Sequence, residues 1–187
     1  MTNELEKTAL LLMDLQPGII DNLDNKDEFL KKVQTTIDFA HKNKIQIIYV
    51  VVSFREGAPE ISSSNKIFST MKERASSSMV NINPVFDIQY NDILVTKHRI
   101  SAFSGSDLDM ILRAGGFENI VISGISTSGV VLSTTREAAD KDFKITILSD
   151  LCFDSDPEVH LILMNKIFPR QANIITSNDW FNNINSN

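Results

Sequence analysis

The sequence has few of the features that mark secreted or membrane proteins. Of its 187 residues only Cys152 is a cysteine, so no disulfide can form within the chain, which agrees with a reducing cytoplasm. No apolar run approaches the roughly 20 residues that a membrane-spanning helix needs. Acidic side chains at Glu4 and Glu6 precede the first apolar run, which is not the pattern of a signal peptide. We therefore expect a cytoplasmic protein that does not bind a membrane.

Positive charge and cofactor motifs are also scarce. The 18 Lys and Arg residues are outnumbered by 24 Asp and Glu residues, for a net charge of −6, and such a surface does not attract nucleic acid. Neither a GxGxxG pattern nor a GxxxxGK[ST] loop occurs, so a nucleotide is not indicated. The three histidines, His41, His98 and His160, lie far apart, and no metal site can be read from them. We expect no cofactor and no metal.

What the chain does contain is a regular alternation of strand-like and helix-like segments. Six short apolar runs have the pattern of buried strands, namely Thr8–Asp14, Ile45–Ser53, Asp92–Thr96, Asn119–Ser123, Lys144–Ser149 and Asn173–Thr176. Helical segments between them predict a three-layer α/β/α fold around a six-stranded, mainly parallel, Rossmann-like sheet. The length suits a single domain over residues 1–187.

Helices are expected where apolar residues recur at helical spacing or where capping residues begin a segment. These are Asp27–Asn43, Asp107–Ala114, Val130–Lys141, Pro157–Phe168 and Ser177–Trp180, followed by a frayed tail over Asn182–Asn187. The stretch Arg55–Asp87 is the least regular and carries one short helix near Lys66–Arg74. Such an excursion often covers an active site, and a solvated surface loop is the alternative.

Two charged residues stand where predicted strands end. Asp14 ends the first strand and Lys97 ends the third. Right-handed crossovers bring these carboxyl ends to one edge of the sheet, where α/β proteins bind ligands. A carboxylate and an ammonium there could transfer a proton and stabilise developing negative charge. The alternatives are that Asp14 is a helix or turn cap and that Lys97 is solvated beside His98 and Arg99.

A glycine-bearing turn, GISTSGV at Gly124–Val130, joins the fourth strand to its helix. A helix that begins in this way presents backbone N–H groups to an anion or an oxyanion. The pattern alone is weak, because many α/β proteins contain such a turn. It gains weight only together with Asp14 and Lys97.

These three places together resemble the isochorismatase-like hydrolase superfamily, also called cysteine hydrolases. The matching segments are LLLMDLQPGI at Leu10–Ile19, VTKHRISAF at Val95–Phe103 and VISGISTSGVVLSTTREAAD at Val121–Asp140, with further support from ITILSD at Ile145–Asp150. The resemblance implies a small-molecule substrate and a homodimer or homotetramer. It also implies catalytic roles for Asp14 and Lys97, an oxyanion site at the backbone of Ser126 and Val130, and a cis peptide bond between Ile125 and Ser126. The pocket that it implies is lined by Phe103, Thr127, Ser128 and Gly129.

The sequence departs from the family at the nucleophile. Family amidases carry a cysteine six residues after the glycine that opens the turn, and here that residue is Val130, so a thioester at this position is excluded. Cys152, expected after the fifth strand, is interpreted as a structural thiol. The Asp-x-His metal signature of the nicotinamidases is missing as well.

The family's isochorismatases also lack the cysteine. They protonate a vinyl ether with the aspartate, and water then attacks without a covalent intermediate. The present chain resembles that branch, although its small Ser126-Thr127-Ser128 segment differs from the larger aromatic or histidine-containing turn of those enzymes.

Three functions therefore stay open. The first is a hydrolase of a small metabolite in which Asp14 is the general acid and base and Lys97 its electrostatic partner. The second is a catalytically silent member that binds a small molecule or acts as a scaffold. The third is an amidase with Ser128 or Thr127 as nucleophile, but no general base is apparent beside either hydroxyl.

Overall fold

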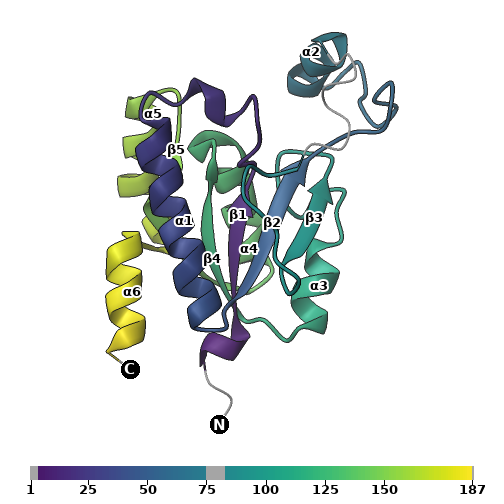
Figure 1. Ribbon diagram of the computed structural model, residues 1–187. Coiled ribbons are helices and arrows are strands. Elements are labelled where there is room, and N and C mark those ends of the chain that lie inside the picture. The colour runs from purple at the N-terminus through teal and green to yellow at the C-terminus, as the bar shows by residue number, and fades with distance from the viewer. Residues whose placement is uncertain (1–3, 75–82, 187) are drawn as a thin grey trace.

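A parallel sheet of six strands forms the centre of the computed structural model, which describes residues 4–74 and 83–186. The strands lie in the order β3-β2-β1-β4-β5-β6, and every neighbouring pair is parallel (Figure 1). Their bounds are β1 (Thr8–Met13), β2 (Gln46–Val52), β3 (Ile93–Lys97), β4 (Asn119–Ile125), β5 (Lys144–Phe153) and β6 (Asn173–Ile175). The predicted α/β fold with a parallel sheet is confirmed.

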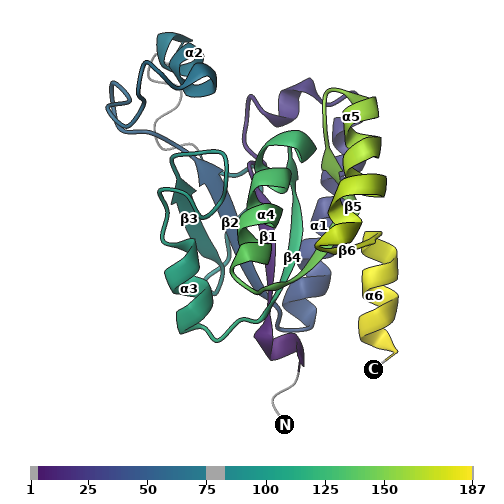
Figure 2. The same ribbon diagram turned by 180° about the vertical axis from the view of Figure 1, so that it is seen from behind.

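Helices cover both faces of this sheet. One face carries α1 (Lys26–Lys42) and α6 (Ser177–Asn185), which lie in front of the strands in Figure 1. The opposite face, seen in Figure 2, carries α3 (Leu108–Ala114), α4 (Leu132–Asp140) and α5 (Pro157–Ile162). Short helical turns complete the chain at η1 (Glu4–Lys7), η2 (Ile20–Asn22), η4 (Thr127–Val131), η5 (Leu163–Ile167) and η6 (Phe168–Arg170).

The central strand β1 shows why the sequence folds in layers. All six of its residues are buried, as its almost continuous apolar pattern predicts. Leu10 and Leu12 pack in the core beneath α1 and α6, whereas Leu11 and Met13 pack in the core beneath α3 and α4. The alternation of side chains along one strand thus supplies both cores.

Strand β5 is longer than the sequence predicted. It runs to Phe153 instead of Ser149, so Cys152 lies within the strand and not after it. The polar pair Ser149-Asp150 interrupts the apolar run, so the sequence did not indicate that the strand continues. The Asp150 carboxylate is used inside the fold, where it accepts hydrogen bonds of 2.7 Å from both the N–H and the hydroxyl of Ser177 at the start of α6.

The C-terminal helix also extends further than predicted. It continues to Asn185, whereas the sequence suggested an end at Trp180 and a frayed tail. Phe181 stacks on Phe39 of α1 with a ring-centroid distance of 4.3 Å, and this contact fixes the additional turns. The cap is Thr176, which forms a capping box with Asp179.

The irregular excursion contains the predicted helix, α2 (Lys66–Arg74), which projects beyond the carboxyl ends of β2 and β3 (Figure 1). A small apolar core of Phe54, Ala58, Ile61 and Phe68 holds its described part together. Residues 75–82 of this stretch lie outside the described residues. That the excursion covers a site stays a prediction.

The strand order locates a switch point in the sheet. From β1 the chain proceeds outward to β2 and β3, and it then crosses to the other side of β1 to form β4. The carboxyl ends of β1 and β4 therefore flank the place where connections diverge, which is where open α/β sheets bind ligands.

Candidate active site

Asp14 occupies this switch point directly after β1. Its N–H donates to the Val50 carbonyl at 2.8 Å, so the backbone still follows the sheet at this residue. Its φ of 58° is in the left-handed region, which aspartate visits more readily than most residues other than glycine. The chain thus turns sharply at Asp14, and the carboxyl stays at the sheet edge.

Lys97 reaches Asp14 from two strands away. Its Nζ lies 3.0 Å from Asp14 Oδ2, and the two side chains are only 2% and 9% exposed. Because β2 separates β1 from β3, the strands that carry them are about 10 Å apart, a gap that a long lysine side chain can span. The ammonium also donates to the carbonyls of Arg99 at 3.0 Å and Ile100 at 3.1 Å. The ion pair expected from the sequence is present.

Burial dominates the electrostatics of Asp14. Removal from water raises the pKa of its carboxyl from 3.8 to about 6, although the charge and the hydrogen bond of Lys97 act in the opposite direction. The other carboxylate oxygen, Oδ1, is buried and has no hydrogen-bond partner among residues 4–74 and 83–186. One oxygen is therefore held by Lys97, and the second, although buried, is left to take a proton.

The turn after β4 brings a second set of groups to the same edge. The peptide bond between Ile125 and Ser126 is cis, as the resemblance implied. The N–H of Ser128 donates to the Asp154 carboxylate at 2.7 Å. The Ser126 carbonyl accepts the N–H groups of residues 129 and 131, each at 3.2 Å. None of these bonds uses the N–H of Ser126 or of residue 130, which the sequence assigned to the oxyanion.

Gly124 allows the turn to pack closely against β1, and Gly129 allows close packing within the turn itself. A Cβ on Gly124 would lie 2.6 Å from the Met13 carbonyl oxygen, so only glycine fits where β4 passes the end of β1. A Cβ on Gly129 would lie 2.7 Å from the Ser126 hydroxyl. The first contact is with rigid backbone and the second with a side chain that can rotate.

Val130 and Phe103, two further residues expected at the site, lie in the core beneath α3 and α4. Val130 is the last residue of the turn and is 2% exposed. The ring of Phe103 packs against Phe143, just before β5, with centroids 6.1 Å apart. These are the contacts of packing residues, and they lend no support to the expected pocket-lining role of Phe103.

Cys152 lies closer to the turn than the sequence indicated. It is paired with Gly124 across β4 and β5 and is buried. Burial raises the pKa of its thiol to about 12, so almost no thiolate forms at neutral pH. Its interpretation as a structural thiol agrees with this environment.

Sequence reasoning missed one neighbour of the turn. His160 on α5 places Nδ1 2.9 Å from the Thr127 hydroxyl, so an imidazole does lie beside one of the two candidate hydroxyls. Burial lowers the pKa of His160, and the charge of Asp154 partly offsets this effect. The available signal was the helix start at Asp156-Pro157, which follows β5 and therefore begins at the carboxyl edge as well.

Each histidine has a separate polar partner. His41 contacts the Asp92 carboxylate at 2.8 Å, and His98 contacts the Ser53 carbonyl at 2.6 Å. Across the described part of the chain, no group of three or more His, Cys, Asp or Glu side chains could hold a metal ion. In the same part, no helix combines the length and the apolar character needed to cross a membrane.

Known proteins of one family are similar to this chain in sequence and in structure. The model of the isochorismatase domain matches residues 8–179. The chain is 29% identical over 182 residues to the isochorismatase family protein YwoC of Bacillus subtilis, covering 97% of this chain and 96% of that protein. It is 27% identical over 189 residues to the ureidoacrylate amidohydrolase RutB of Acinetobacter baylyi, covering 87% and 77%. The structure of an isochorismatase family protein from Burkholderia thailandensis is 27% identical, with a TM-score of 0.75 over 93% of each chain.

Proposed function

The chain belongs to the isochorismatase family, whose members are hydrolases, and from this premise we propose that it hydrolyses a small metabolite by acid–base chemistry at Asp14 and Lys97. Asp14 is the general acid and base, and Lys97 is its electrostatic partner. No covalent cysteine intermediate forms, because valine stands at position 130. A cytoplasmic location and a homodimer or homotetramer are part of the same proposal.

The buried ion pair with one uncommitted carboxylate oxygen carries this proposal. A carboxyl with a pKa of about 6 is half protonated at pH 6 and about one-tenth protonated at pH 7. Such a group can both give and accept a proton near neutral pH, which is the property of an efficient general acid and base.

In the proposed reaction, protonated Asp14 gives its proton to the substrate, and a carbon of the substrate becomes electrophilic. Water attacks this carbon, and the Asp14 carboxylate takes one proton from the attacking water. The bond between the carbon and its oxygen or nitrogen substituent then breaks, and the hydroxyl proton of the adduct passes to this leaving atom, so that water is divided between the two products. Lys97 favours the carboxylate form between the two proton transfers.

The hydroxyl alternative has less support. Thr127 has an imidazole beside it, but its side chain is fully buried. Ser128 is exposed, but the Asp154 carboxylate that its hydroxyl contacts has a lowered pKa and is therefore a weak base. A serine nucleophile needs a base that accepts its proton as it attacks.

The experiment is turnover of a panel of vinyl ethers, ureido acids and simple amides, followed by mass spectrometry. We expect hydrolysis of at least one compound, and Asp14→Asn should reduce its rate by about 10²- to 10⁴-fold. The matched control is Asp142→Asn, because Asp142 is an exposed aspartate with a similar φ of 63°, and its rate should be unchanged.

Normal turnover by the Asp14→Asn variant would contradict the mechanism. If no compound is hydrolysed and a panel compound nevertheless raises the melting temperature, the silent-binder function replaces the hydrolase.

A further inference from the structure

The ammonium of Lys97 is held by the loop that follows it. Besides Asp14, its acceptors are the carbonyls of Arg99 and Ile100, so all three of its protons are directed to oxygen. These two carbonyls immediately precede Ser101. The position of the ammonium therefore depends on what fixes the backbone at residues 99–101.

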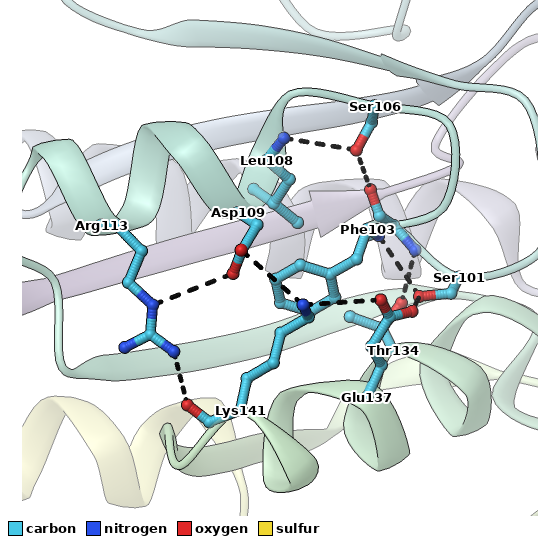
Figure 3. A network of polar contacts seen from close by, with 10 residues as sticks. Ser101, Phe103, Ser106, Leu108, Asp109, Arg113, Thr134, Glu137 and Lys141 are labelled. Carbon is cyan, nitrogen blue, oxygen red and sulfur yellow. Dashed lines mark hydrogen bonds and ion pairs between the residues drawn. The ribbon is translucent and has the colours of Figure 1, made fainter.

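Helix α4 fixes this backbone at two points, one turn apart. The Ser101 hydroxyl donates to the Glu137 carboxylate at 2.6 Å, and the N–H of Ala102 donates to the Thr134 hydroxyl at 2.9 Å. The Ser101 hydroxyl also accepts the N–H of Phe103 at 3.2 Å. Figure 3 shows Ser101 and Phe103 facing Thr134 and Glu137 on the helix.

These contacts are buried at their centre. Thr134 is fully buried, and Ser101 is 8% exposed. A hydroxyl that donates to a carboxylate at 2.6 Å makes a charge-assisted bond, which is stronger than one between neutral groups. The Glu137 side chain is about one-third exposed, so Ser101 is the buried end of the pair.

The rest of the network lies toward solvent. Lys141 Nζ is 3.9 Å from Glu137 and 3.7 Å from Asp109, and Arg113 is 3.9 Å from Asp109 (Figure 3). Long, partly exposed ion pairs contribute little and do not hold a side chain firmly. Lys141 therefore differs from Thr134 and Glu137 and provides an internal control.

We propose that Thr134 and Glu137 are positioning residues: by binding residues 101 and 102 they hold the carbonyls of Arg99 and Ile100, and through these the ammonium of Lys97, against Asp14. This inference rests on the proposed function, because it concerns the same Asp14–Lys97 pair. The same helix follows the turn at Ser126–Val130, so α4 fixes both the turn and the cation that serve the candidate site.

The proton affinity of Asp14 reports the position of Lys97 without any substrate. Lys97 is the charged group that lowers the pKa of Asp14, so a looser ammonium means a higher pKa. The measurement is a carbon-13 NMR titration of the Asp14 carboxyl in the full chain. It is made for the wild type and for variants whose fold is checked by the dispersion of amide resonances.

Two substitutions test the positioning. Thr134→Val removes the acceptor of the Ala102 N–H with little change of shape, and Thr134→Ser restores a hydroxyl. Glu137→Gln keeps an acceptor for Ser101 but removes its charge. We expect Thr134→Val and Glu137→Gln each to lower the acid dissociation constant of Asp14 by about 3- to 10-fold, which means a higher pKa. Thr134→Ser and the control Lys141→Gln should leave it unchanged.

Unchanged ionisation of Asp14 in folded Thr134→Val and Glu137→Gln proteins would overturn the proposal. An equal change in Lys141→Gln would overturn it too, because the long ion pairs of Lys141 do not hold residues 101 and 102. If Thr134→Val does not fold, Glu137→Gln decides alone. A changed Asp14 pKa in a protein that hydrolyses no compound would support the positioning while removing the hydrolase function.

Discussion

Asp14 should make the protein less stable as the pH rises from about 4 to 7, which is the reverse of a carboxylate stabilised by an ion pair. Its pKa is about 6 in the folded chain and 3.8 when it is exposed to water. Between these values the folded state holds more protons than the unfolded state, so rising pH favours unfolding. The contribution is absent below about pH 3.8 and complete above about pH 6.

The magnitude follows from the two pKa values. Their difference of about 2.2 corresponds to about 3 kcal/mol, since each tenfold change in an equilibrium constant is about 1.4 kcal/mol. The side chain is only 9% exposed, so solvent screening removes little of this amount. Other carboxyls, among them Asp21 and Glu118, have lowered pKa values, and their contributions to the stability of the protein are lost as the pH falls. The stability of the whole protein therefore does not show the contribution of Asp14 directly.

The assay is therefore a difference between two proteins. Urea unfolding of the wild type and of Asp14→Asn, measured between pH 4 and pH 8, gives the free energy of unfolding of each. Loss of the partner of Lys97 lowers the stability of the variant by an amount that is constant with pH in this range. The wild type should lose about 3 kcal/mol relative to the variant as the pH rises, most of it before pH 7.

The matched control is again Asp142→Asn, which removes an exposed carboxylate and shows what the loss of one surface charge produces. A wild type that gains stability relative to Asp14→Asn with rising pH would show that Lys97 outweighs burial. A flat difference would show that the two effects cancel. Either result would refute a carboxyl poised near pH 6.

Three further substitutions probe the surroundings of this pair. Cys152→Ala and thiol alkylation should leave turnover intact because Cys152 is buried with a raised pKa, and loss of activity in a folded alkylated protein would make it catalytic. Gly124→Ala should destabilise the fold by more than about 2 kcal/mol in urea unfolding, because its Cβ meets the rigid Met13 carbonyl, and an unchanged midpoint would contradict this packing. Gly129→Ala should cost less than about 1 kcal/mol, because the Ser126 hydroxyl can rotate away, and a loss as large as that of Gly124→Ala would show that this hydroxyl is fixed.

The strand pattern was predictable because burial on both faces leaves a signal that is local in sequence. The continuous apolar runs of β1 and β2 identify these strands directly. The extension of β5 was not predictable in this way, because Asp150 is polar and its partner Ser177 lies 27 residues further along the chain. A local pattern does not record a hydrogen bond between distant segments.

The same reason separates the site residues that the sequence predicted from those that it did not. The sequence predicted that Asp14 and Lys97 lie together because each stands at the end of a strand, and parallel strands end at one edge. His160 could not be assigned to Thr127, since its helix gives no indication of which turn it faces. The carbonyls that hold Lys97, and the residues of α4 that fix the backbone beside them, leave no local pattern in the sequence.

The place of β3 at the edge of the sheet has a consequence for the local stability of the site. This strand has five residues and, among residues 4–74 and 83–186, it is hydrogen-bonded on one side only, to β2. Strands at sheet edges open at a lower free energy than central ones, so β3 and Lys97 can separate from the sheet while β1 stays folded. Each opening removes the cation from beside Asp14 and leaves the carboxyl with a stronger hold on its proton. A ligand that binds the charged form of Asp14 therefore slows amide hydrogen exchange in β3, even if it touches no atom of that strand.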